Sequence, residues 1–283
     1  MCRMPTNRPL RLADREGRVQ RQCGGRPMQL ARKLTTLTTT AACAAACVAM
    51  LAQAAAAQEI SGSGFLFGAP SGNLTIRAGY AAATAGSDLF SFATNELTLQ
   101  RGDFGSFAFG ADLAFALRPR WDLVFSADVG GMDKKSEYRE WQDNSGKPIE
   151  QTTSFSRQSF AASMKYYFMP YGRRLGRFAW VPARYAPWVS GGFGRTQYRF
   201  KQTGDFIDFE KDNQVFNDSF LSSKWAATAQ VAAGLDWNIN QRWALTSQLK
   251  YLLGSADLGL DFSGFAPIDL SGLGMTAGLT IRF

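Results

Sequence analysis

The last eleven residues, Leu273 to Phe283, alternate strictly between apolar side chains and polar or small ones. Leu273, Met275, Ala277, Leu279, Ile281 and Phe283 fall on one face of an extended strand, and the residues between them fall on the other. A period of two describes a strand with an apolar environment on one side and a polar one on the other. A terminal aromatic residue on the apolar face favours a closed membrane barrel, in which the last strand pairs with the first and the ring anchors at the interface.

The first 57 residues are typical of a leader. Met28–Lys33 is a short basic start, Leu34–Ala52 is uncharged, and Ala55–Ala57 supplies the small residues that a signal peptidase needs. We therefore expect a signal peptide over 28–57, preceded by an over-extended start over 1–27.

Two alternatives remain for this leader. A transmembrane helix would need a basic stop-transfer cluster after the apolar run, and none follows. A lipoprotein would be anchored at Cys43 or Cys47, but Thr40 and Ala44 stand where its signal has Leu.

The leader distorts the composition. Nine of the 31 Lys and Arg residues and two of the 23 Asp and Glu residues lie before residue 58, so nearly all of the formal net charge of +8 leaves with the leader. A basic surface for nucleic acid is therefore not expected. All four cysteines also precede residue 58, so the mature chain has no disulfide, thiolate nucleophile or Cys-ligated metal.

Residues 58–283 have the length of one domain. They hold no apolar run near the roughly 20 residues of a membrane helix, so any spanning segment would be a strand of about 9–11 residues. A short lead-in, 58–72, would precede a barrel over 73–283. The alternation predicts eight strands, at 73–85, 104–118, 121–131, 153–169, 188–200, 224–239, 242–254 and 273–283. Glu96–Arg101 or Ile60–Phe67 would raise the count to ten.

The two faces of these strands differ in chemistry. One face collects Trp, Phe and Leu, and the other nearly every charge, as where the outward Ile76 and Ala78 flank the inward Arg77. A soluble lipocalin-like barrel would reverse this arrangement. The pattern predicts an all-β, antiparallel, up-and-down transmembrane barrel with polar inward positions. Aromatic residues near strand ends would form interface girdles: Trp121, Trp188, Trp225, Trp237, Trp243 and Phe283. The strand 188–200 is glycine-rich and of unclear parity, so a bulge is an alternative there.

The connections set an orientation. Short turns at 118–120 and 238–242 and a long basic connection, 169–186, would face the periplasm, whereas longer loops would face outward. The expected outer loops are 86–103, 132–152, 201–223 and 255–271. Four aromatic residues are candidates for loop recognition: Tyr138, Trp141, Phe206 and Phe209. The acidic residues of 205–212 fit no EF-hand spacing, and no metal site is expected.

Eight charged residues fall at inward positions: Arg77, Asp112, Asp122, Asp128, Lys165, Asp236, Lys250 and Arg282. An eight-stranded barrel is just wide enough for side chains to fill it, and single buried charges are costly. We expect these groups to pair and to plug the interior. A gated ion path through rearranging pairs and an interior ligand site are the alternatives.

The segment Ala186-Pro-Trp-Val-Ser-Gly-Gly-Phe-Gly194 and the terminal Phe283 carry a family resemblance. The chain resembles the small eight-stranded outer-membrane barrels of the OmpA/OmpX/opacity-protein type. The resemblance implies a bacterial outer-membrane location and contact with membrane lipid and lipopolysaccharide. It also implies delivery by periplasmic chaperones and the barrel assembly machinery, for which Leu279, Ile281 and Phe283 would form the insertion signal.

The sequence contains no histidine, which excludes the usual general base and the Ser-His-Asp triad. The known outer-membrane barrel enzymes resemble one another in relying on a catalytic histidine. We therefore assign none of their catalytic residues to this chain, and we expect no cofactor. The favoured function is a structural or surface-binding protein that acts through long extracellular loops. The alternative is a narrow channel or conduit for ions or small hydrophobic molecules.

Overall fold

The computed structural model describes residues 68–283 except 143–145, 176–178 and 209–213. The predicted leader, the lead-in up to residue 67 and Phe209 lie outside these residues. The described part belongs to one compact unit, Leu66–Phe283.

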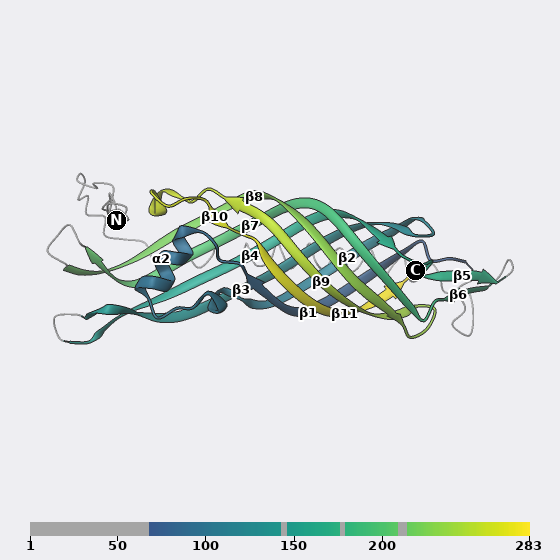
Figure 1. The fold of residues 1–283 in the computed structure, drawn as a ribbon, viewed down its shortest axis with the longest axis horizontal. Coiled ribbons are helices and arrows are strands. Elements are labelled where there is room, and N and C mark those ends of the chain that lie inside the picture. The colour runs from purple at the N-terminus through teal and green to yellow at the C-terminus, as the bar shows by residue number, and fades with distance from the viewer. Residues whose placement is uncertain (1–67, 143–145, 176–178, 209–213) are drawn as a thin grey trace, which may run out of the picture. The chain divides into compact units, whose positions relative to one another are not determined.

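Eight antiparallel strands close into a ring (Figure 1). They are β1 (Gly72–Ala83), β2 (Ser106–Arg118), β3 (Trp121–Gln142), β4 (Pro148–Tyr167), β7 (Tyr185–Asp208), β8 (Gln214–Asn238), β9 (Trp243–Ala256) and β11 (Gly272–Arg282). The ring closes where β1 pairs with β11, from Asn73 opposite Arg282 to Ala83 opposite Gly272. The predicted eight-stranded barrel is confirmed. Within the described residues, Glu96–Arg101 contributes no further strand, and Leu97 makes only an isolated bridge to Tyr138.

Smaller elements gather at the two ends of the barrel (Figure 1). The loop end carries α2 (Asp88–Glu96), η2 (Arg101–Phe104), η3 (Leu260–Phe262) and β10 (Ile268–Asp269). The turn end carries the hairpin of β5 (Gly172–Leu175) and β6 (Ala179–Pro182), together with the carboxyl terminus.

The side chains divide between the outside and the inside of the ring as predicted. On β1, Ile76 is 66% exposed and Arg77 is 3% exposed, because adjacent residues of a strand point to opposite faces. The wall is a nearly continuous apolar surface that includes Phe107, Phe109, Phe125, Phe160, Phe193, Trp225, Val231, Trp237, Leu245, Leu249, Met275 and Leu279. Among the described residues, no helix is long and apolar enough to cross a membrane.

Strand β7 has regular parity. It pairs with β4 and β8 without a register shift, so the bulge considered for 188–200 does not form. Phe193 points outward and is 79% exposed, whereas Trp188, Tyr198 and Phe200 are buried. The prediction of Trp188 as an interface residue is therefore wrong: this indole lies inside the barrel.

Two of the predicted loops are largely strand. β3 and β4 stay paired out to Glu137 and Glu150, and β7 and β8 out to Asp208 and Gln214. The loop boundaries 132–152 and 201–223 are therefore wrong. Beyond the apolar wall one face of each strand stays buried, as at Gln151 and Thr153, but polar residues occupy both faces. The strands therefore continue without the alternation of apolar and polar residues that would reveal them in the sequence.

Candidate functional site

A four-residue charge network crosses the interior from four strands. Arg77 donates from Nε and Nη2 to the two carboxylate oxygens of Asp112, both at 2.8 Å. Its Nη2 also lies 2.7 Å from Oδ1 of Asp128, whose other oxygen pairs with Lys250. Two cations thus face two carboxylates. The arrangement compensates charges whose solitary burial would cost several kcal/mol each.

A second network centres on Asp236 of β8, which is 2% exposed. Its Oδ2 accepts from Lys165 Nζ and from the Tyr167 hydroxyl, both at 3.1 Å. Its Oδ1 accepts from Trp188 Nε1 at 2.9 Å and from the Thr246 hydroxyl at 3.0 Å. The Lys165 ammonium also lies 4.1 Å from the Trp188 ring centroid. One carboxylate therefore joins β4, β7, β8 and β9.

The two remaining inward charges, Asp122 and Arg282, lie near the turn end. They are 1% and 5% exposed. Arg282 donates to Asn238, and its guanidinium carbon lies 5.7 Å from the centroid of Trp180. Asp122 Oδ1 and Arg282 Nη1 have no hydrogen-bond partner among the described residues. Six of the eight predicted interior charges are thus drawn into ion pairs, and these two are not.

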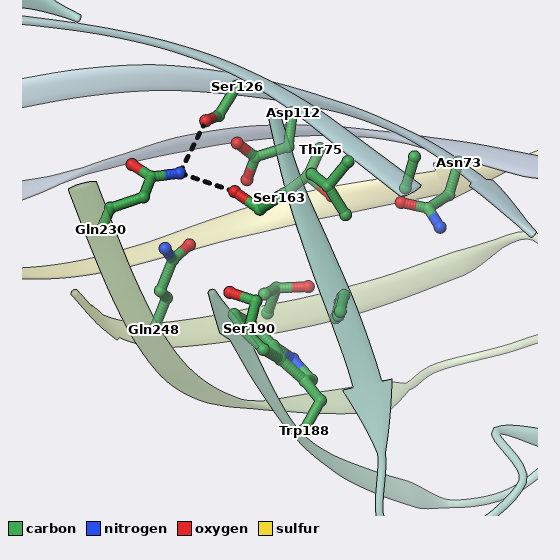
Figure 2. Close-up of a pocket in the computed structure, with 13 residues that line it drawn as sticks. Asn73, Thr75, Asp112, Ser126, Ser163, Trp188, Ser190, Gln230 and Gln248 are labelled. Atoms are coloured by element: carbon green, nitrogen blue, oxygen red, sulfur yellow. Dashed lines mark hydrogen bonds between the residues drawn. The ribbon is translucent and has the colours of Figure 1, made fainter. Parts of the chain in front are cut away.

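Hydroxyl and amide groups fill the space between the networks (Figure 2). Gln230 Nε2 donates to Ser126 Oγ at 3.1 Å and to Ser163 Oγ at 2.8 Å. A cavity of about 30 Å³ remains beside these groups, and one of about 60 Å³ lies beside Arg77, Asp128 and Lys250. Spaces of this size hold a few waters at most and do not form an open channel.

An apolar cluster closes the loop end. The Phe90 ring of α2 lies 4.7 Å from that of Phe104, 5.4 Å from Phe155 and 6.0 Å from Phe200. Phe155 and Phe200 point inward from β4 and β7, so α2 lies over the mouth of the ring. Phe262 of η3 adds a further contact, 5.4 Å from Phe200. Sequence reasoning missed this plug, because the region 86–103 was predicted as an outer loop.

Polar contacts fasten the plug to the barrel. Asp103 accepts a hydrogen bond from the Gln100 amide at 3.0 Å and an ion pair from Lys134 of β3 at 3.0 Å. The amide bond, and then the ammonium, lower the pKa of the Asp103 carboxyl below its ordinary 3.8. Arg157 Nη1 donates to the Leu270 carbonyl at 2.8 Å, which holds the connection before β11 from inside.

Aromatic rings and the β5–β6 hairpin close the turn end. The Tyr167 and Tyr171 centroids are 5.1 Å apart, and those of Tyr171 and Trp180 are 5.9 Å apart. These rings pack with Trp188, and Trp180 is 2% exposed. Burial raises the pKa of Tyr171 to about 12, so its phenol is neutral at physiological pH. The described residues of the long basic connection predicted over 169–186 are therefore folded, and Tyr171 and Trp180 cover this end of the barrel.

The predicted recognition residues occupy different settings. Tyr138 packs against the plug, and Phe206 is 8% exposed, with its ring 4.7 Å from that of Phe220. Trp141 is partly exposed near the tip of the β3–β4 hairpin. In the described residues, no three His, Cys, Asp or Glu side chains are arranged to hold a metal ion.

The geometry defines a closed eight-stranded barrel with an apolar wall and a paired polar interior. No protein-family model and no curated protein matches the chain. Among solved structures, it is similar to Neisserial surface protein A, with 13% identity over 76% of this chain and 99% of that one, at a TM-score of 0.42. OprG from Pseudomonas aeruginosa shows 13% identity over 77% and 99%, at a TM-score of 0.43. The outer-membrane protease OmpT from Escherichia coli shows 10% identity over 79% and 100%, at a TM-score of 0.40. Each likeness is one of fold alone.

Proposed function

We propose that the protein is a closed outer-membrane barrel with a structural and surface-binding role, carried by the two long hairpins of its loop end. The observation that supports this most directly is the threefold obstruction of the interior. The apolar plug around Phe90, the ion pairs around Arg77 and Asp236, and the rings around Trp180 lie in series along the axis.

The wall supports the membrane location. Side chains such as Phe107 (75% exposed) and Met275 (71%) would be costly in water, but they match a lipid environment. The short turns and the longer hairpins lie at opposite ends, so the loop end would face the outside.

The hairpins supply a stiff platform for binding. β7 and β8 remain paired for 24 successive residue pairs, and the Phe206 ring packs against Phe216 and Phe220 near their tip. A ligand would meet ordered strands, and this limits the entropy lost on binding.

The alternative, a conduit for ions or small hydrophobic molecules, would require α2 to leave the mouth. Phe90 is fully buried and would lose its contacts with Phe104, Phe155 and Phe200. The structural and surface-binding role of a closed barrel is therefore better supported than the role of a conduit.

Protease treatment of intact cells that express the full chain tests this orientation. Trypsin should cut at Lys134, Arg139 or Lys147 in intact cells, and it should reach Arg173 and Arg174 only after the outer membrane is permeabilised. Cleavage at 173–174 alone in intact cells would reverse the orientation and refute the proposal.

A further inference from the structure

The exposed charges at the turn end are predominantly positive. Arg118, Arg120, Arg173, Arg174 and Arg184 are exposed, and Arg242 is partly exposed. The side-chain carboxylates described at this end, Asp122 and Asp236, are 1% and 2% exposed and point into the barrel. None of these six arginines takes part in an ion pair between described residues.

A cleft of about 560 Å³ opens within this basic end. The segment before β1, the β2–β3 turn and the β5–β6 hairpin form its walls, with Arg118 and Arg174 on two of them. Leu117, Pro119 and Trp180 supply apolar surface beside the two guanidinium groups. The volume lies within the range of small-molecule sites, about 300–1,000 Å³.

The height of this cleft on the barrel is that of a membrane interface. Arg118 stands opposite Trp121 in the β2–β3 register, and the Trp121 and Tyr166 ring centroids are 4.8 Å apart on the outer face. Rings of this kind mark the headgroup level of a bilayer. Leu117 (55% exposed) and Phe115 (40%) continue from the cleft along the lipid-facing wall.

We propose that this cleft binds the headgroup of an anionic phospholipid of the inner leaflet, with its phosphodiester between Arg118 and Arg174 and its acyl chains along Leu117 and Phe115. The inference rests on the proposed outer-membrane function, which places the turn end at the periplasmic leaflet. Arginine matches this ligand because its planar guanidinium forms two parallel hydrogen bonds to phosphate oxygens. The apolar residues beside the cleft favour a ligand with acyl chains over a free anion.

The chain offers a matched control for this site. Arg120 and Arg173 lie beside the two cleft residues, in the same turn and the same strand, but do not line the cleft. Successive strand residues point to opposite faces, so Arg173 and Arg174 lie on opposite sides of the hairpin. The double variant R120Q/R173Q therefore removes the same charge as R118Q/R174Q.

Native mass spectrometry of the full chain, expressed in a Gram-negative host and extracted in detergent, measures the binding. Phosphatidylglycerol, phosphatidylcholine and inorganic phosphate are the added probes. We expect the unmodified protein to retain phosphatidylglycerol about tenfold better than phosphatidylcholine, from two charge-assisted contacts. R118Q/R174Q should lose this preference and R120Q/R173Q should keep it, while millimolar phosphate should not displace the lipid.

Three results would overturn the site. They are an equal loss in both double variants, equal retention of the two lipids, and displacement by phosphate alone. A heat-modifiable gel shift identifies folded barrel, and only folded samples enter the comparison. A barrel that conducts ions but retains phosphatidylglycerol would contradict the closed-barrel function and leave this site standing.

Discussion

Trp188 on β7 donates its indole N–H to Oδ1 of Asp236 on β8 across 2.9 Å, inside the barrel. The contact binds an aromatic ring to the carboxylate that also receives Lys165, Tyr167 and Thr246. Asp236 is therefore the most heavily bonded charge of the interior, and its removal is the most informative single change there.

Asp236→Ala should destabilise the barrel by about 3–5 kcal/mol, since it leaves the Lys165 ammonium buried without its carboxylate. Asp236→Asn preserves the shape and some hydrogen bonds, and it should lose less. Urea unfolding of both variants in lipid vesicles measures the difference. Urea midpoints equal to that of the unmodified protein would show that Asp236 does not stabilise the barrel.

The other network predicts an order of effects. Asp128→Ala leaves Lys250 with no carboxylate partner, whereas Asp112→Ala leaves Arg77 bonded to Asp128. Asp128→Ala should therefore lower the urea midpoint further than Asp112→Ala does. The reverse order, or no shift for either variant, would contradict the paired network.

The plug should open before the barrel unfolds. Phe90→Ala removes a ring in contact with three others, a loss of about 3–5 kcal/mol where the site does not collapse. Protease cleavage within 84–105 should accelerate, while the gel shift of the folded barrel persists. Phe92→Ala is the control, because Phe92 is only partly buried and its ring meets Phe265. Equal cleavage in the two variants would show that Phe90 does not hold the plug.

The Asp103 contact should depend on pH. Its carboxyl has a lowered pKa in the folded chain, so its contribution is complete above the ordinary value of 3.8 and is lost as the pH falls through the folded value. Hydrogen exchange at the Gln100 amide should therefore accelerate, relative to its intrinsic rate, only below about pH 4. Asp103→Asn should abolish this transition, and a transition that survives the change would assign it to another group.

The sequence predicts the part of the fold that lies in the membrane. There the outward face of each strand contacts lipid and is apolar, and the inward face is polar. This alternation allowed the orientation of Ile76 and Arg77 and the count of eight strands to be predicted. Beyond the apolar wall the outward residues no longer contact lipid. The strand pairing out to Glu137 and Asp208 is therefore not marked by an alternation of apolar and polar residues in the sequence.

The alternation of residues along each strand does not predict which interior charges pair with each other. Parity places Lys165 and Asp236 inside, but only the stagger of the strands determines that they meet. Trp188 resembled an interface residue because its type is common there, whereas its position among inward residues buries it. Phe90 and its neighbours lack a strand pattern, and their cluster depends on contacts distant in the sequence.

Planar-bilayer recording of the protein extracted from membranes after expression of the full chain tests the closed-barrel account most directly. With folded barrel confirmed by its gel shift, the account predicts no steady current at high salt, for the unmodified protein and for Phe90→Ala alike. The Arg77 and Asp236 networks remain in that variant. A stable, salt-dependent current through the unmodified barrel would contradict the account and place these charges along an ion path.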